Sequence, residues 1–340
     1  MSESTGFKKG RCIQRWNTFL LATVLIAGCT TLAAHNEGPL REGEEVAPFV
    51  AEMRGAGLDE SEVRKILADA RIVPEVLEAI SRPAEAKPWY AYRPIFVTES
   101  RIAKGVEFWR SEQATLERAE KAFGVPAEII VAIIGVETLY GERAGRIRVL
   151  DSLVTLGFRY PRRSKFFRSE LKHFLLLARD ERLDPLAVKG SYAGAMGVPQ
   201  FISSSYRNYA VDFDDDGRRD LISSTADAIG SVANYLKRHG WLPGGDIAVA
   251  ATVDGAAYKE VLALGLKPEL TVKELSEKGI QLQGEVDRNA RAALIELEQE
   301  HGMEYWVALN NFYVITRYNH SQLYAMAVTQ LAAKIRDRYL

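Results

Sequence analysis

Residues 124–146, GVPAEIIVAIIGVETLYGERAGR, constrain the fold more than any other part of the chain. The stretch predicts an apolar helix, because Pro126 suits a first turn, in which its missing N–H has no intrahelical partner. The glycines at 141 and 145 suit the end of that helix. Near its C-terminal end the helix carries one acid, Glu137. The fold must therefore place a carboxyl group in apolar surroundings.

The neighbours of Glu137 indicate an acid that points inward. Isoleucines precede it by seven, four and three residues and so share its helical face: Ile130, Ile133 and Ile134. A carboxylate among isoleucines loses hydration, so we expect the pKa of Glu137 to rise toward the range of a general acid near neutral pH. The alternatives are a solvated glutamate and a buried one paired with Arg143 or Arg146, since buried charges are usually paired.

Composition narrows the class of protein only a little. At 340 residues the chain is long enough for one large domain or two modest ones. The 44 basic and 45 acidic residues give a formal net charge of -1, so no global field favours nucleic acid, and we expect no such partner. A hydrophobic content of 47% and a charged content of 26% are ordinary for a globular protein.

The N-terminus has the layout of a secretory signal. Basic residues lie within 8–15, and a mainly apolar run covers 16–27, which is too short to span a bilayer comfortably. The sequence LIAGC at 25–29 resembles a bacterial lipobox, in which cleavage precedes the cysteine and Cys29 is acylated. Several acyl chains bury enough methylene for stable anchoring, where one chain binds only marginally. We expect a signal peptide at 1–28 and a polar tether at 29–45.

The residue after the cysteine indicates which membrane the lipid enters. It is Thr30 rather than an aspartate, which in lipoproteins generally favours the outer membrane. We therefore expect a protein on the periplasmic face of the bacterial outer membrane, anchored in its inner leaflet. The alternatives are an uncleaved membrane anchor and a soluble periplasmic protein cut near Ala33-Ala34. Cys12 lies in the discarded segment, so no disulfide is expected.

Helical patterns dominate the chain after the tether. Thr98 is placed to cap one long helix that reaches Phe123 and leads into the helix of Glu137. Further helices are expected at 164–178 and 224–241.

Three segments break the helical pattern. The Pro-rich aromatic segment 82–94 is expected to be extended. Two glycines and a proline make 192–201 a helix-to-helix turn or a place where a ligand approaches the backbone closely. Short Val/Ala runs and alternation in 244–310 predict a small region with strands, which a terminal helix follows.

An acidic loop at 212–220 has the spacing of an EF-hand. The residues at ligand positions one, three, five and seven, the last through its carbonyl, are Asp212, Asp214, Asp216 and Arg218. Ser223 replaces the bidentate glutamate of position twelve, so we expect Asp227 to complete the shell. The prediction is a structural Ca2+ in loop 212–227, and a solvated acidic loop is the alternative.

The sequence lacks the signatures of most catalytic chemistries. The histidines show no HExxH or similar pairing, and no GxSxG, P-loop or dinucleotide fingerprint occurs. Ordinary retaining and inverting glycosidases need two carboxylates flanking the scissile bond. A single inward glutamate near aromatic and amide residues can still cleave a glycoside if the substrate supplies the nucleophile. This reasoning points to murein, with no cofactor for catalysis.

Several motifs, in order, carry a resemblance to a known family. They are GVETLYG at 135–141, GSYAGAMG at 190–197 with Gln200-Phe201, AVDF at 210–213, DAIGSVANY at 227–235 and NFYVITRYNHS at 311–321. Together they resemble the membrane-bound lytic murein transglycosylase B family, from about Pro48 to the C-terminus. The resemblance implies a mainly α (α+β) fold: a goose-type lysozyme-like helical core with an EF-hand-like loop and a small appended region containing strands. The implied domains are a core at 46–243 and 311–340 and an appended α/β domain at 244–310.

The resemblance also implies a mechanism for Glu137. The residue would protonate the glycosidic oxygen between N-acetylmuramic acid and N-acetylglucosamine. As a carboxylate it would then take the proton of the muramyl 6-hydroxyl as that oxygen attacks C1. The product is a 1,6-anhydromuramyl end, and no water is consumed.

Matching positions imply the substrate contacts. Ser191 would position the N-acetyl group, and Gln200 and Asn319 would hold sugar hydroxyls. The residues implied to line the saccharide cleft are Tyr92, Tyr235, Tyr318 and Tyr324, and those implied to meet lactyl or peptide-stem carboxylates are Arg162 and Arg163. Phe166 stands where the family can have a tyrosine, so that hydroxyl contact is absent. The implied partners are peptidoglycan glycan strands, with cell-wall synthesis complexes as candidate recruiters.

Two other functional classes stay open at this point. A hydrolytic muramidase would use the same glutamate but admit water, and would leave reducing muramyl ends. A catalytically silent murein-binding lipoprotein would keep the cleft and the tether without turnover.

Overall fold

The computed structural model describes residues 46–82 and 87–340. The expected signal peptide, lipidation site at Cys29 and tether lie outside the described residues. Within the described ranges no helix combines the length and the apolar character needed to cross a membrane.

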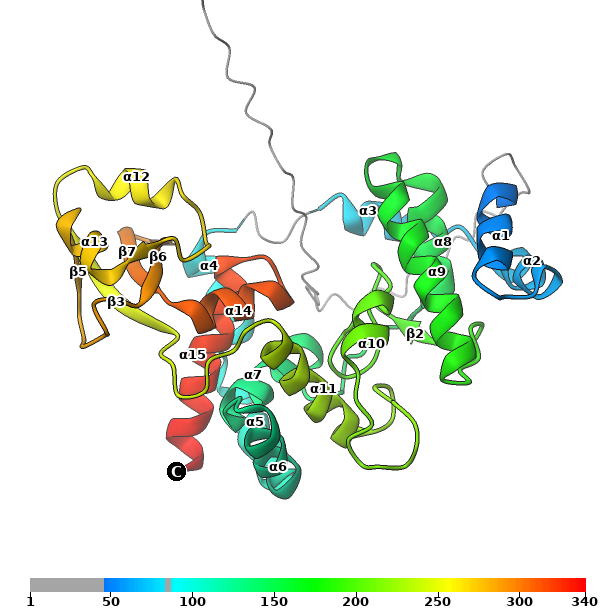
Figure 1. Ribbon diagram of the computed structural model, residues 1–340, viewed down its shortest axis with the longest axis horizontal. Helices are drawn as coiled ribbons and strands as arrows, with labels where there is room; N and C mark the ends of the chain where they lie inside the picture. Colours follow the sequence, from blue (N-terminus) through cyan, green and yellow to red (C-terminus); the bar gives the residue numbers. More distant parts are fainter. Residues whose placement is uncertain (1–45, 83–86) are drawn as a thin grey trace, which may run out of the picture.

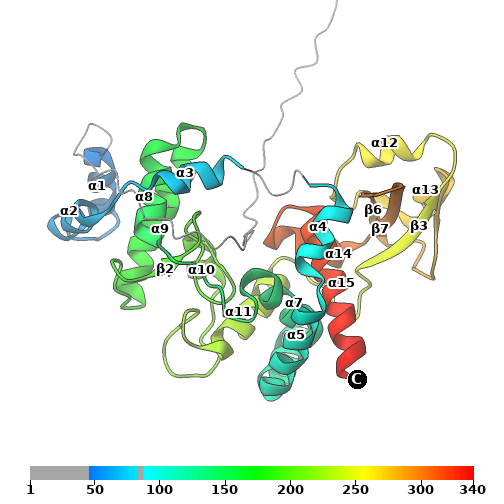
Figure 2. The same cartoon turned by 180° about the vertical axis from the view of Figure 1, so that it is seen from behind.

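The described helices form two groups, with a small sheet beside one of them (Figure 1). The first group is α1 (Val46–Gly55), α2 (Glu60–Asp69), α3 (Pro74–Ile80), α8 (Val149–Arg159), the 3-10 turn η2 (Pro161–Arg163), α9 (Ser164–Asp180) and α10 (Ser203–Tyr209). The second is α4 (Trp89–Phe96), α5 (Glu99–Ser111), α6 (Gln113–Phe123), α7 (Ala127–Thr138), α11 (Thr225–Arg238), α14 (Asn310–Tyr318) and α15 (Gln322–Tyr339). Figure 2 shows the same two groups from behind.

Strands occur mainly within one region of the described chain. A sheet with strand order β4-β6-β7-β3-β5 pairs every neighbour in the antiparallel direction. Its elements are β3 (Ala248–Val253), α12 (Tyr258–Leu262), β4 (Leu270–Thr271), α13 (Val272–Glu277), β5 (Ile280–Leu282), β6 (Arg291–Gln299) and β7 (Gly302–Ala308). A separate two-stranded ribbon joins β1 (Ile147–Arg148) to β2 (Lys189–Gly190). The predicted fold class, mainly α with a small region of strands, is confirmed.

Strand β6 packs on two different cores because its side chains alternate between the faces of the sheet. Leu294 belongs to a small cluster with α12 and α13, whereas Ile295 and Leu297 belong to the main core. The appended region therefore has a core of its own and is also seated on the helical core.

Helix α7 lies at the centre of the helical core, in contact with α5, α11 and α15. Every residue of α7 except Glu128 is buried, so the helix is enclosed on nearly all sides. The predicted helix is longer than the observed one at both ends. Pro126 is the N-cap, and the helix stops at Thr138 rather than near the glycines.

The early end of α7 comes from two residues that are not glycine. Leu139 and Tyr140 adopt left-handed conformations, with φ of 51° and 62°. Their N–H groups donate to the carbonyl oxygens of Gly135 (3.1 Å) and Ile134 (3.4 Å), which closes the helix in the manner of a glycine C-cap.

Two further expectations about helices need correction. The single helix predicted from Thr98 to Phe123 is divided into α5 and α6 at Glu112, whose φ and ψ are -106° and 19°. The break lets the two halves reach different partners: Trp109 of α5 stacks on Tyr339 at 4.2 Å, and α6 packs against α11. Thr98 does cap α5, because its side chain accepts the N–H of Arg101.

The segment predicted to be extended contains helix α4. Trp89 and Tyr92 lie one turn apart, both are buried, and their rings stack at 6.3 Å. Pro94 is tolerated inside this helix because it lacks only the N–H that would reach Tyr90, and Tyr90 is exposed to water. Burial of one aromatic face outweighs the helix-breaking tendency of the prolines.

The packing around α7 predicts a large cost for truncating it. Ile133 is fully buried, so Ile133→Ala should lower the free energy of unfolding by about 2–5 kcal/mol through lost contacts and a residual cavity. Ile222 is 39% exposed, so Ile222→Ala is the matched control and should change stability by roughly 0.5 kcal/mol or less. Urea unfolding followed by circular dichroism measures both, and equal losses would contradict a central position for α7.

Candidate active site

Glu137 lies in the last turn of α7 with 6% of its surface exposed. Burial raises the pKa of this carboxyl group to about 8. The hydroxyl of Tyr324, from the first turn of α15, donates a hydrogen bond to Glu137 Oε1 at 2.6 Å and acts in the opposite direction on the pKa. Among the described residues no lysine or arginine, including Arg143 and Arg146, forms an ion pair with Glu137. A group in this setting is protonated near neutral pH and can donate its proton.

Ser321 orients the tyrosine that contacts the acid. Its side chain accepts the N–H groups of Leu323 (3.2 Å) and Tyr324 (3.3 Å), which caps the N-terminus of α15. Ser321 has no role among the expectations from sequence, although a serine before an apolar helical run is a recognised N-cap signal.

The loop at 190–201 lies against the end of α7. Thr138, next to the acid, donates through Oγ1 to the carbonyl of Val198 at 2.8 Å. Gly197 adopts a φ of 74°, and a Cβ there would lie 2.3 Å from the carbonyl oxygen of Leu221, so this position requires glycine. No local sequence pattern identifies Thr138, because its role depends on a contact 60 residues away.

Gln200 and Ser191 are the polar side chains of this loop, and both are buried. Gln200 has a φ of 52°, and its Nε2 donates to the carbonyls of Ala144 (3.0 Å) and Gly197 (2.9 Å). Its Oε1 has no hydrogen-bond partner among the described residues. Ser191 Oγ accepts the N–H groups of Ala195 (3.0 Å) and Ala193 (3.3 Å). The loop is thus fixed from within and retains an unused acceptor.

Three tyrosines form a cluster beside the acid. Tyr318 and Tyr324 stack with ring centroids 6.4 Å apart, and the Tyr235 ring lies 4.9 Å from that of Tyr318. Tyr318 donates to the carbonyl of Pro199 and Tyr235 to that of Arg317, each at 2.6 Å. These bonds fix the rings, so their faces form a rigid surface.

Two other residues predicted to contact the substrate, Asn319 and Tyr92, are buried. Asn319 directly follows α14 and is 5% exposed. Tyr92 is fully buried and packs on Phe96 with ring centroids 5.0 Å apart. Helix α4, which carries Tyr92, packs against α15, which carries Tyr324.

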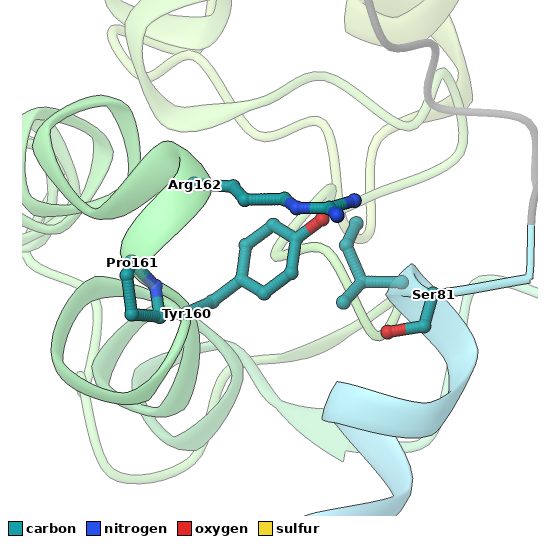
Figure 3. Close-up of a pocket in the computed structure, with 5 residues that line it drawn as sticks. Ser81, Tyr160, Pro161 and Arg162 are labelled. Carbon is teal, nitrogen blue, oxygen red and sulfur yellow. The ribbon is translucent and has the colours of Figure 1, made fainter.

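The two arginines predicted to meet substrate carboxylates, Arg162 and Arg163, lie in different surroundings. Arg162 is exposed and lines a cavity of about 550 Å3 with Ile80, Ser81, Tyr160 and Pro161 (Figure 3). Arg163 places its guanidinium 4.1 Å from the ring centroid of Phe166. Figure 3 shows the Arg162 side chain running beside the Tyr160 ring. Both lie in η2, and neither forms an ion pair with Glu137 in the described chain.

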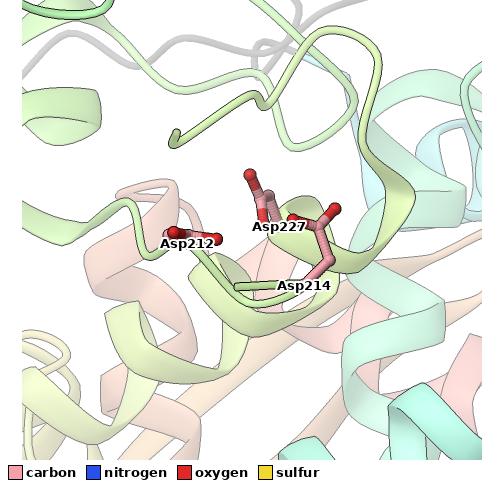
Figure 4. Close-up of side chains that lie close together, drawn as sticks. All are labelled: Asp212, Asp214 and Asp227. Carbon is pink, nitrogen blue, oxygen red and sulfur yellow. The ribbon is translucent and has the colours of Figure 1, made fainter. Parts of the chain in front are cut away.

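The acidic loop gathers Asp212, Asp214 and Asp227, each with one carboxylate oxygen within 4.8 Å of the others (Figure 4). Oxygens at this separation fit a shared Ca2+, which takes oxygen ligands at about 2.3–2.6 Å. Burial raises the pKa of Asp227, whose oxygens accept the N–H groups of Phe213 (2.6 Å) and Asp220 (2.7 Å).

Asp216 is not part of this carboxylate cluster, and the proposed ligand from Arg218 is a backbone carbonyl, which stays a prediction. Asp216 Oδ1 instead accepts the N–H of Arg218 at 2.8 Å, a bond that shapes the turn. Gly217, with a φ of 86°, takes the sharp turn expected at the sixth position of the loop.

Comparison with known proteins places this arrangement in a family. The model of a family described as a transglycosylase SLT domain matches residues 41–333. The chain belongs to the transglycosylase SLT domain family. The family expected from the sequence motifs, and its lysozyme-like fold class, are therefore confirmed. A lytic transglycosylase is the enzyme class that this family indicates.

Individual family members align over most of the chain. Membrane-bound lytic murein transglycosylase B of Escherichia coli is 45% identical over 82% of this chain and 79% of its own length. The catenated lytic transglycosylase SltB1 of Pseudomonas aeruginosa is 48% identical, with a TM-score of 0.84 over 88% of this chain and 99% of that one. The Escherichia coli transglycosylase Slt35 in complex with calcium is 42% identical, with a TM-score of 0.80 over 89% and 96%.

The buried carboxyl group should make stability depend on pH. Between the ordinary glutamate pKa of 4.5 and a folded-state pKa of about 8, the folded chain keeps a proton that the unfolded chain has lost. The free energy of unfolding therefore falls as pH rises through this window, by up to about 1.4 kcal/mol per pH unit. Glu137→Gln carries no such proton, so its stability relative to the wild type should increase from pH 5 to pH 8.

Urea unfolding at intervals across that window measures the difference. Glu107→Gln, on the exposed face of α5, controls for the loss of one negative charge. A constant difference between Glu137→Gln and the wild type at every pH would show that Glu137 does not titrate as a buried acid.

Proposed function

We propose that this chain is a lytic transglycosylase that cleaves the β-1,4 bond between N-acetylmuramic acid and N-acetylglucosamine in peptidoglycan, with Glu137 as its only catalytic acid and base. The observation that carries the proposal is the setting of Glu137, which is buried, has a raised pKa and has no second carboxylate among the groups that shift it. Family membership supports the reaction class.

One carboxyl group is sufficient for both proton transfers of the reaction. Neutral Glu137 gives its proton to the glycosidic oxygen as the bond from that oxygen to muramyl C1 breaks, and N-acetylglucosamine leaves as an alcohol. Positive charge at C1 is shared with the N-acetyl oxygen in an oxazolinium-like species. The muramyl 6-hydroxyl then attacks C1 and returns its proton to the carboxylate. The product is the 1,6-anhydro sugar, and Glu137 is protonated again.

Tyr324 is suited to both stages of this cycle. Its hydroxyl donates to Glu137 Oε1 at 2.6 Å, and a hydrogen bond to a carboxylate is stronger than one to a neutral carboxyl group. The bond therefore stabilises the transient anion most, while burial keeps the resting group protonated. A cationic partner would instead hold the acid ionised at rest.

The buried polar side chains fit the sugar contacts that we propose for them. Ser191 Oγ already accepts two N–H groups, so it retains its hydrogen to donate to the N-acetyl carbonyl. Gln200 Oε1 can accept from a sugar hydroxyl because it has no partner within the described chain. We assign Asn319 to a second hydroxyl contact.

The outer parts of the substrate meet aromatic and basic side chains in this proposal. The faces of Tyr235 and Tyr318 suit the apolar faces of sugar rings. Arg162 in its cavity suits a lactyl or peptide-stem carboxylate, and Arg163 contributes from its position over Phe166. Tyr92 supports this wall from helix α4, which packs against α15.

We further propose that the chain is a lipoprotein of the outer membrane. The relative from Escherichia coli is membrane-bound by name, and the lipobox-like sequence ending at Cys29 supplies the attachment point. The catalytic core, 46–243 with 311–340, would then face the periplasm on the tether 29–45, with the domain 244–310 appended. Peptidoglycan is the partner, and cell-wall synthesis complexes are candidate recruiters.

Muropeptide analysis tests the proposed reaction. Mass spectrometry of fragments released from purified sacculi should detect 1,6-anhydromuramyl ends, which weigh one water less than hydrolytic products. Glu137→Gln should abolish release, by at least about a thousandfold, because it removes the only acid and base, yet still bind sacculi in a pull-down. Reducing ends would identify a hydrolytic muramidase, and binding without turnover by the wild type would identify a silent binding protein.

A structural Ca2+ in the acidic loop is also part of the proposal, and the calcium complex of Slt35 supports it. Added Ca2+ should raise the thermal midpoint of the wild type, with about 2.7 kcal/mol of stabilisation at a hundredfold excess over Kd. Asp212→Asn, with or without Asp216→Ala, should lose this response. Asp215→Asn is the matched control, since that side chain is 88% exposed and outside the cluster. An equal response in the Asp212 and Asp215 variants would reject the site.

A further inference from the structure

Arg101 is a buried cation whose charge has no carboxylate partner in the described chain. It lies in the first turn of α5 and is 8% exposed. Its Nε donates to the carbonyl of Gly135 at 3.0 Å, and its Nη1 donates to those of Ile95 (2.6 Å) and Phe96 (3.0 Å). Every hydrogen bond found for this guanidinium therefore reaches a backbone carbonyl.

Those carbonyls belong to the C-terminal turns of two helices. Ile95 and Phe96 are the last residues of α4, and Gly135 lies in the last turn of α7. Each helix C-terminus carries about half a negative charge and leaves carbonyls without intrahelical partners. Two such ends offset the charge of one guanidinium, which explains how Arg101 is tolerated in the core. Arg101 thereby joins the helix of Tyr92 to the helix of Glu137.

Tyr140 completes this arrangement from the other side of Glu137. Its hydroxyl donates to the carbonyl of Arg101 at 2.8 Å. A Cβ on Gly105 or on Gly135 would lie 2.6 Å or 2.5 Å from that hydroxyl oxygen, so the ring fits only because both positions are glycine. The left-handed φ of 62° at Tyr140 is unfavourable for a tyrosine and persists because these contacts hold the ring.

The catalytic group needs support of this kind because of where it lies. The last turn of a helix is its least constrained part, and Glu137 lies between Gly135 and the left-handed pair Leu139-Tyr140. Arg101 holds Gly135, two residues before Glu137, and Tyr140 holds the chain three residues after it. Because Tyr140 contacts Arg101, both restraints come from one unit.

We propose that Arg101 and Tyr140 are positioning residues that hold the last turn of α7 so that the Glu137 carboxyl group meets the glycosidic oxygen. The inference rests on the proposed role of Glu137. Neither residue touches the substrate. Displacing a reacting group by about 1 Å can cost a hundredfold in rate, so loosening this turn should lower kcat and leave substrate binding nearly unchanged.

Tyr140→Phe is the sharpest test, because it removes one hydroxyl and keeps the ring. On soluble, uncrosslinked glycan strands we expect kcat to fall by about tenfold to a hundredfold, with KM changed less than about twofold. The matched control is Tyr206→Phe, since Tyr206 is fully buried and donates to the carbonyl of Arg219 at 2.6 Å, away from α7. That variant should lose comparable thermal stability and keep the wild-type kcat.

Arg101 variants test the other half of the unit. Arg101→Lys retains the charge but cannot reproduce the forked geometry, whereas Arg101→Met removes both. We expect kcat to decrease in the order wild type, Arg101→Lys, Arg101→Met, measured on folded protein with melting curves recorded in parallel. In a Glu137→Gln background, Tyr140→Phe should cause no further loss, because the group being positioned is absent.

The outcomes separate the two proposals. If Glu137→Gln keeps full turnover, the proposed function fails, whatever the other variants do. If Glu137→Gln is inactive but Tyr140→Phe and Arg101→Lys keep the wild-type kcat, the positioning role is overturned and the contacts serve stability alone. A fall in kcat for Tyr206→Phe equal to that for Tyr140→Phe would overturn it as well.

Discussion

The arrangement of this protein depends on burying the Glu137 carboxyl group without an ion pair. A neutral carboxyl costs far less to bury than a carboxylate, so a raised pKa is the physical consequence of enclosing α7. The contact that accompanies this burial is the Tyr324 hydroxyl, whose hydrogen bond to Glu137 is stronger when the carboxyl group is ionised. An arginine in the same place would have held Glu137 ionised, and the residue could then not donate a proton. The core thus accepts an unpaired ionisable group where the chemistry needs one.

The loop at 190–201 is fixed by donors that arrive from separate elements and end on backbone carbonyls. Thr138 of α7 reaches Val198, and Tyr318 of α14 reaches Pro199. Gln200 returns to Ala144, just beyond α7. Because these bonds use neutral donors and carbonyl acceptors, they make the loop rigid without adding charge beside Glu137. The unused Oε1 of Gln200 is then available to a ligand in a fixed position.

Local pattern was sufficient wherever the deciding interaction is local. Isoleucine spacing placed Glu137 inside, and the aspartate spacing at 212–216 drew attention to a loop in which two of those acids do converge. The pattern failed where a distant contact decides. Leu139 and Tyr140 end α7 although neither is glycine, and Tyr140 contacts Arg101, which is 39 residues away.

Distance in sequence explains the other errors and omissions too. The hydrogen-bond partner of Glu137, Tyr324, is 187 residues away in the sequence. Local spacing could not predict this contact, and only the family resemblance placed Tyr324 in the cleft. Segment 82–94 reads as extended because its prolines are a local signal, whereas burial of Trp89 and Tyr92 is a tertiary one that favours helix α4. Propensity is the weaker influence once an aromatic face has a core to enter.

Helix α11 connects the acidic loop to the aromatic surface beside Glu137. Asp227 lies in its first turn and Tyr235 eight residues later, about 12 Å along the axis. Ser224 caps the same helix and donates to Asp214 at 2.6 Å. Crowded carboxylates at this end repel one another; the helix dipole offsets part of that charge, and the proposed cation offsets more. Helix α11 also packs along α7, so one helix joins the acidic loop, Tyr235 and the helix that carries Glu137.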